Sequence, residues 1–171
     1  MDALKAAAIL FVAAIVQLSV LTEYQLFRTA SVVLVALLAV ALLRGSVFGA
    51  VAGFLTGLVL DTATLGTLGI TSLLLTVAGF WIGRYGETTA RDRFHAPYLS
   101  VLVVTVLYAF GALVLRFVLG DPVPAHAVLT ALPAVVLWNL LLTWPLYALV
   151  RRIFPPAELF DRAYEVRLLG Q

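Results

Sequence analysis

The stretch GAVAGFLTGLVLD, residues 49–61, places Gly49, Gly53, Gly57 and Asp61 at four-residue intervals within an apolar segment. Four residues are close to one helical turn, so these positions share one stripe of a helix. Three glycines flatten the stripe and let the backbone of another helix come close, as small-xxx-small motifs do. The stripe therefore predicts a helix-packing surface, within the chain or toward a partner helix. A substrate groove is the alternative interpretation.

The composition around this stretch is that of a membrane protein. Of the 171 residues 63% are hydrophobic and only 12% are charged, and the mean hydropathy is +1.09. Soluble domains are roughly 45–50% apolar and about 25% charged, so most of this surface cannot face water. The absence of cysteine excludes disulfides, thiolate metal sites and cysteine nucleophiles. The net charge of +2 is too small to indicate a nucleic-acid partner.

Apolar runs separated by polar breaks predict an all-α integral membrane protein, a bundle of six transmembrane helices in residues 1–154. The predicted spans are residues 4–21, 30–43, 46–60, 70–83, 98–119 and 127–150. Pro133 and Pro145 predict kinks in the last span. Residues 155–171 form a short amphipathic tail, which would lie on the cytoplasmic membrane surface or bind a cytoplasmic partner.

The distribution of basic residues predicts the orientation. With the N-terminus inside, nine of the eleven Lys and Arg residues are cytoplasmic, and only Arg28 and Arg116 face outward. The positive-inside rule then predicts that both termini and the polar stretch 84–97 are cytoplasmic. The inner set is Lys5, Arg44, Arg84, Arg91, Arg93, Arg151, Arg152, Arg162 and Arg167.

Asp61 is the first candidate for function because acidic residues are rare near the spans of such a chain. A carboxylate at the C-terminal end of a helix faces the negative end of the helix dipole and needs compensation. One possibility is an ion pair with Arg116 or Arg28. Another is a cap of the 62–69 turn, for example through the amides of Ala63 and Thr64. Substrate or proton chemistry is the third, and a contact with a partner protein is the fourth.

Two other sets of residues are candidates for contacts between helices. Gly79 and Gly83, also four apart, lie at the same predicted depth as Gly49 and Gly53, so the closest approach of the two spans is expected in their inner halves. The amides of Gln17 and Asn139 lie within spans, and each is expected to form hydrogen bonds across helices.

Catalytic signatures are missing from the sequence. It contains no G-x-S-x-G, no H-E-x-x-H, no P-loop and no Gly-rich dinucleotide turn. Two amides and a series of Ser and Thr residues are also few polar groups for transport chemistry, which uses several near the bilayer midplane. We therefore expect no enzymatic activity, no cofactor and no metal site.

Two runs of sequence resemble the rod shape-determining MreD family. The first is LRG at 43–45, followed by GxxxGFxxGLxxD at 49–61 and LG at 65–66. The second is WNLL at 138–141, followed by PL at 145–146 and RR at 151–152. The resemblance implies a non-catalytic component of the bacterial cell-elongation machinery, the elongasome, in the inner membrane. It also implies a six-helix fold similar to the S-components of energy-coupling-factor transporters.

The same resemblance implies the partners. The chain would bind MreC, a single-span protein, and together they would support MreB filaments. Indirectly they would also support RodA with its class B penicillin-binding protein, the peptidoglycan synthase. The alternative function is a small-molecule or lipid binder of the S-component type. A deep, polar-lined outer pocket would favour that alternative, whereas a dry or lipid-filled cavity favours the scaffold.

Overall fold

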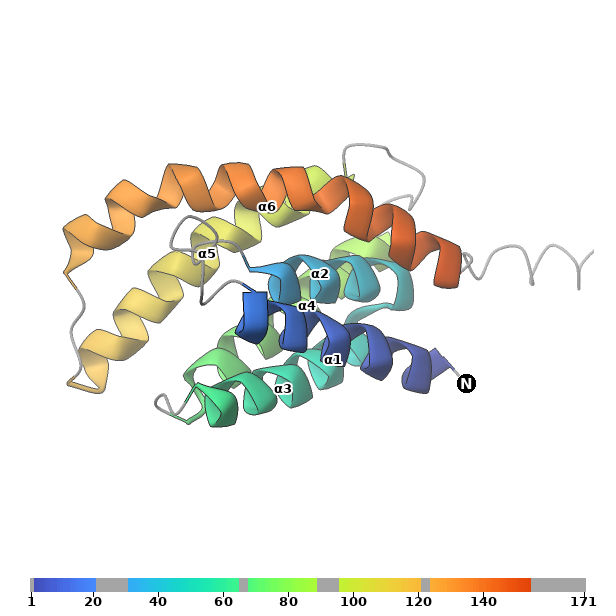
Figure 1. The fold of residues 1–171 in the computed structure, drawn as a ribbon, viewed down its shortest axis with the longest axis horizontal. Helices are drawn as coiled ribbons and strands as arrows, with labels where there is room; N and C mark the ends of the chain where they lie inside the picture. Colours follow the sequence, from blue (N-terminus) through green and yellow to red (C-terminus); the bar gives the residue numbers. More distant parts are fainter. Residues whose placement is uncertain (1, 21–30, 65–67, 89–95, 121–123, 155–171) are drawn as a thin grey trace, which may run out of the picture.

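The computed structural model describes residues 2–20, 31–64, 68–88, 96–120 and 124–154. They form an all-helical bundle (Figure 1). Its helices are α1 (Asp2–Val20), α2 (Val32–Arg44), α3 (Ser46–Ala63), α4 (Ile70–Thr88), α5 (Ala96–Val118) and α6 (Ala125–Ile153). The predicted tail 155–171 and the residues Arg28, Arg91, Arg93, Arg162 and Arg167 lie outside the described residues.

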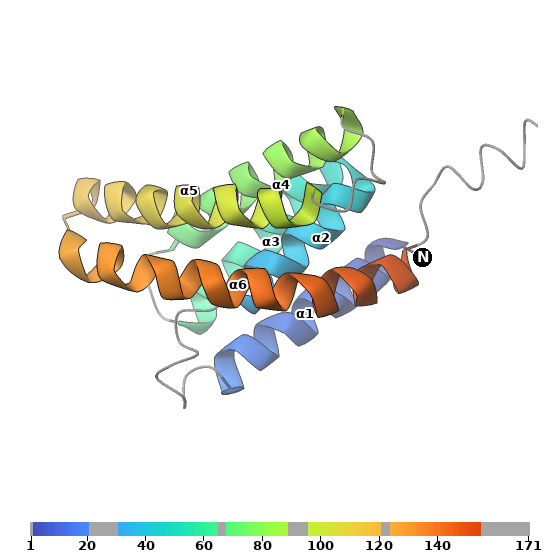
Figure 2. The same cartoon turned by 90° about the horizontal axis from the view of Figure 1, so that it is seen from above.

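The short helix α2 is the centre of the bundle. Every residue from Val32 to Leu43 is buried, and α2 contacts each of the other helices. A helix that is apolar on all sides suits such a position, because no face of it has to meet water. Figures 1 and 2 show α2 enclosed between α1, α3 and α4 on one side and α5 and α6 on the other.

Two helical hairpins enclose α2. The α3–α4 hairpin has the most extensive contact in the bundle, and α5 packs along α6 (Figure 2). Helix α6 carries Pro133 and Pro145 in its interior and follows a curved path in Figure 1. A proline removes one backbone hydrogen bond and displaces the preceding turn, which accounts for such bending.

Helix lengths and composition agree with a membrane location. In the described part, three helices are long and apolar enough to span a bilayer, over Ser46–Ala63, Pro97–Val118 and Ala125–Ile153. Two further apolar helices are shorter, Leu4–Gln17 and Val32–Arg44. Helix α4 extends to Thr88, whereas the sequence predicted an end at Gly83. Large apolar side chains cover much of the outer surface, among them Phe11, Val51, Leu107 and Trp144.

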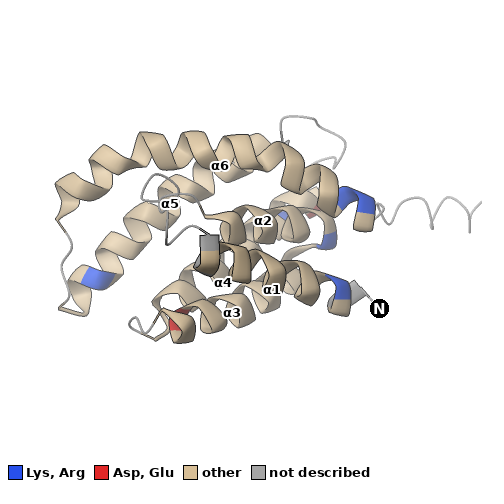
Figure 3. Cartoon of the chain, viewed as in Figure 1, with Lys and Arg blue, Asp and Glu red and all other residues tan. Residues whose placement is uncertain are grey.

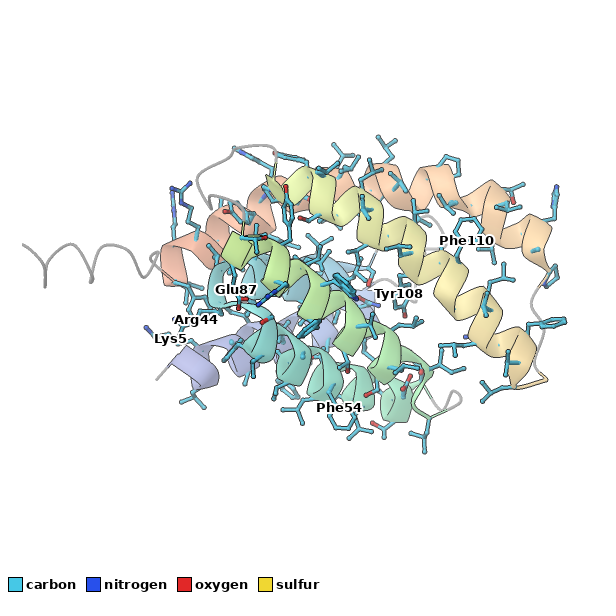
Figure 4. The ribbon with its side chains drawn as sticks, turned by 180° about the vertical axis from the view of Figure 1, so that it is seen from behind. Lys5, Arg44, Phe54, Glu87, Tyr108 and Phe110 are labelled. Carbon is cyan, nitrogen blue, oxygen red and sulfur yellow. The ribbon has the colours of Figure 1, made fainter. Side chains whose placement is uncertain are left out.

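The charged residues of the described part gather at the ends of the bundle (Figure 3). Lys5 begins α1, Arg44 ends α2, and Arg151 and Arg152 end α6. Figure 4 shows Lys5, Arg44 and Glu87 at the same end of the molecule. We call this end the basic end, and the end with the α3–α4 turn the opposite end.

Candidate functional site

The glycine stripe of α3 lies against α4. A Cβ added at Gly49 would overlap the carbonyl oxygen of Gly79, and one added at Gly53 would overlap that of Leu75. At Gly57 it would overlap the backbone of Ser72. The stripe is therefore occupied by intramolecular helix packing, in which glycine allows backbone-to-backbone contact.

The contact is longer than the sequence indicated. Gly83 lies against the backbone of Gly45 at the basic end, and Gly57 meets Ser72 near the opposite end. The expectation of a closest approach limited to the inner halves is too narrow. Gly86 also extends the packing to α2, where its added Cβ would overlap the carbonyl of Leu42.

Asp61 caps the start of α4. Its side chain is 3% exposed, and its Oδ2 accepts hydrogen bonds from the amides of Gly69 (2.9 Å) and Ser72 (3.2 Å). Its Oδ1 accepts a third bond from the amide of Thr71 at 3.3 Å. These amides belong to the positive end of the α4 dipole, so they compensate the carboxylate that ends α3.

The prediction that Asp61 accepts hydrogen bonds from the amides of Ala63 and Thr64 is wrong. The Thr64 amide instead donates to the carbonyl of Leu60, as the last turn of α3 requires. Of the two arginines considered as ion-pair partners, Arg116 lies in the last turn of α5 and Arg28 is outside the described residues. The cap on α4 supplies the compensation that the ion pair was expected to provide.

Glu87 caps the start of α3 at the basic end, a role that was not predicted from the sequence. Its Oε1 accepts hydrogen bonds from the Ser46 amide (2.7 Å) and the Ser46 hydroxyl (3.0 Å), at the first residue of α3. Arg84 lies 3.7 Å from the same carboxylate. Gly45 leaves room for it, since a Cβ there would lie 2.5 Å from Oε1 and its φ of 95° disfavours other residues.

The α3–α4 hairpin is thus capped reciprocally. The carboxylate that ends α3 holds the start of α4, and the carboxylate that ends α4 holds the start of α3. Between these two clamps the helices touch through glycines. A signal was present in the sequence: an acidic residue near the C-terminal end of each helix is unfavourable there and favourable at the neighbouring N-terminus.

The N-terminus of α2 is satisfied by side chains from two other helices. Gln17 of α1 accepts from the Val33 amide (3.0 Å), and Asn139 of α6 accepts from the Ser31 amide (2.9 Å). The Ser31 hydroxyl accepts from the Leu34 amide. Asn139, only 1% exposed, also donates to the Thr105 hydroxyl of α5 at 3.1 Å.

These bonds explain why a short helix can be buried. At about 1.5 Å per residue, thirteen residues span about 20 Å, less than a hydrocarbon core of about 30 Å. Free amides at such a helix end have no water available and need protein acceptors. Gln17 and Asn139 supply them, so both in-span amides bond across helices and tie α1, α5 and α6 to α2.

The carboxylates and in-span amides described above are engaged at helix ends. Within the described ranges, no group of three or more His, Cys, Asp or Glu side chains could hold a metal ion. The carboxylates of Asp61 and Glu87 are engaged with helix N-termini. A cavity of about 480 Å³ between α1 and α3 is lined by apolar side chains and by Thr56.

One protein family matches most of the chain. The family model of the rod shape-determining protein MreD matches residues 4–154, which include all the interhelical contacts described above. No curated protein and no solved structure matches the chain. The family match covers most of the sequence, and the chain belongs to the MreD family.

Proposed function

We propose that the chain is a non-catalytic membrane scaffold in bacterial rod-shape determination. The family supports a role in cell shape, and the observation that carries the scaffold proposal is the use of the polar interior. Asp61, Glu87, Gln17 and Asn139 all terminate or join helices. A framework fixed in this way presents rigid outer surfaces, as a protein that organises partners needs.

The proposed placement is the inner membrane, with six spans and both termini in the cytoplasm. The basic end, where Figure 4 shows both Lys5 and Arg44, supports the cytoplasmic assignment through the positive-inside rule. The hairpin helices α3 and α4 and the central α2 would cross as one unit, because glycine contacts join them. Domain boundaries at 1–154 for the spans and 155–171 for the tail are part of this proposal.

The proposed partner is MreC, whose membrane helix would pack on the apolar outer surface. Exposed large side chains on α1, α3, α5 and α6 offer that surface, for example Phe11, Phe54, Phe110 and Leu137. Through MreC the chain would support RodA and the class B penicillin-binding protein. The glycine stripe is not available for this contact, since α4 covers it.

The apolar character of the α1–α3 cavity does not favour a transporter S-component. A specific small-molecule site needs a few convergent polar groups within an apolar pocket. Thr56 is a poor substitute for such a set, and the in-span amides Gln17 and Asn139 are engaged at the end of α2.

Depletion in the native host tests the proposed function. Cells that lose the protein should change from rods to spheres, and plasmid-borne wild-type protein should restore rods. Asp61→Ala should restore them less well at equal membrane abundance, whereas Thr62→Val, its exposed neighbour, should restore them fully. Cells that stay rod-shaped after complete depletion would contradict the proposal.

A further inference from the structure

An elongated apolar groove lies between α1 and α3. Leu4, Ala7 and Phe11 line it from α1, and Phe48, Val51 and Val59 line it from α3. Its volume is about 480 Å³, within the range of roughly 300–1,000 Å³ typical of ligand sites. Such a groove, facing the bilayer, must be filled by something apolar.

The groove runs lengthwise along both helices. Its lining runs from Leu4 to Ala14 on α1 and from Phe48 to Val59 on α3. At about 1.5 Å per residue these stretches are about 15–17 Å long. The groove therefore starts near the basic end and extends to Val59, four residues before the end of α3.

The groove is narrower than a helix. Even the whole open volume of about 1090 Å³, spread over that length, gives a mean cross-section of about 70 Å². A helix with side chains is about 10–12 Å across, which is roughly 80–110 Å². A hydrocarbon chain therefore fits within the groove, whereas a partner helix only rests across it.

Two cations neighbour lining residues of the groove at the basic end. Lys5 is exposed and is flanked by the lining residues Leu4 and Ala6. The guanidinium of Arg44 lies 5.8 Å from the ring centroid of Phe48, another lining residue. Figure 4 shows Lys5 and Arg44 at the same end of the molecule. Basic groups at this depth attract the phosphates of anionic lipids in the cytoplasmic leaflet.

We propose that the α1–α3 groove binds an anionic phospholipid of the cytoplasmic leaflet. One acyl chain fills the groove, and the phosphate meets Lys5 and Arg44. The inference rests on the membrane placement of the proposed function but not on its partners. It identifies a ligand site that would join α1 to the hairpin through the lining residues of α1 and α3.

Native mass spectrometry of the full chain in detergent tests the site. Phosphatidylglycerol and phosphatidylcholine with identical acyl chains are the probes. Wild type should bind phosphatidylglycerol more tightly, and Lys5→Gln should weaken that binding about fivefold while leaving phosphatidylcholine unchanged. Ala7→Trp and Val51→Trp, which fill the groove from either wall, should lose at least tenfold for both lipids.

Val103→Trp is the matched control, because Val103 is an exposed valine of α5 outside the groove. It should bind both lipids as wild type does. Thermal unfolding of each variant separates loss of the site from loss of the fold. Wild-type lipid binding in both folded groove-filling variants, or no preference for phosphatidylglycerol in wild type, would overturn the proposal. Failure of shape complementation would bear on the scaffold function alone.

Discussion

Removal of the Asp61 carboxylate should open the α3–α4 hairpin at the opposite end. In Asp61→Ala, the amides of Gly69, Thr71 and Ser72 lose their acceptor in a site where Asp61 is only 3% exposed. A buried donor without a partner costs about 1–3 kcal/mol. Water that enters the turn will satisfy these amides in part. We therefore expect the free energy of unfolding to fall by about 3 kcal/mol, the lower limit for three such donors.

Asp61→Asn separates hydrogen bonding from charge. The asparagine oxygen can keep the two bonds of Oδ2, to Gly69 and Ser72, while its amino group cannot accept from Thr71. The expected loss in the free energy of unfolding is therefore about 1 kcal/mol. Thr62→Val is the control, because Thr62 is exposed and bonds only to carbonyls of its own helix; its effect should stay within about 0.5 kcal/mol.

Thermal unfolding in detergent, followed by circular dichroism, measures these differences. For a chain of this size about 3 kcal/mol corresponds to a decrease in Tm of about 6–12 °C, and about 1 kcal/mol to 2–4 °C. The capping interpretation is refuted if Asp61→Asn destabilises as much as Asp61→Ala. In that case, recovery by Asp61→Arg combined with Arg116→Asp would identify an ion pair as the dominant interaction.

Three further predictions use the same assay. Gly53→Ala should lower the free energy of unfolding by about 1–3 kcal/mol, because the new Cβ overlaps the Leu75 backbone. Gly111→Ala should be nearly neutral, because its Cβ meets only the flexible end of Leu74. Equal effects of the two substitutions would contradict the backbone contact. Glu87→Ala should lower the free energy of unfolding by about 1 kcal/mol, and Glu87→Gln by less, because one side-chain oxygen still caps Ser46. A larger loss in Glu87→Gln than in Glu87→Ala would argue against capping. Asn139→Leu should lower the free energy of unfolding by about 1–3 kcal/mol, because the Ser31 amide loses its acceptor. The control Thr130→Val, at an exposed position, should leave stability unchanged. Unchanged stability in both variants would show that α2 needs no cap from α6.

The helices themselves could largely be predicted from the sequence, because apolar runs of membrane length leave few alternatives. The main error in their bounds is instructive. Polar residues after Gly83 indicated a loop, yet α4 continues to Thr88, and Glu87 needs that extra turn to reach Ser46. Local composition does not reveal where the hydrogen-bond donors of another helix lie, here the amide and hydroxyl of Ser46.

The candidate site was predictable in kind but not in its partners. The spacing of Gly49, Gly53 and Gly57 indicated close helix packing, since only the helical period matters there. The amides bound by Asp61 are eight to eleven residues further along, so they become neighbours only once α4 packs on α3. The central place of α2 was hidden for a related reason, because lipid and protein interiors both select apolar residues.

Site-specific photo-crosslinking in living cells tests the central claim, a membrane scaffold that binds MreC, most directly. A photoreactive phenylalanine analogue would replace Phe11, Phe54, Phe110 or Leu137 on the exposed surface, with the fully buried Leu37 of α2 as the control. The account predicts a covalent product with the membrane helix of MreC from one contiguous set of exposed positions and none from Leu37. The absence of any MreC product from all exposed positions, in cells whose rod shape depends on the protein, would contradict it.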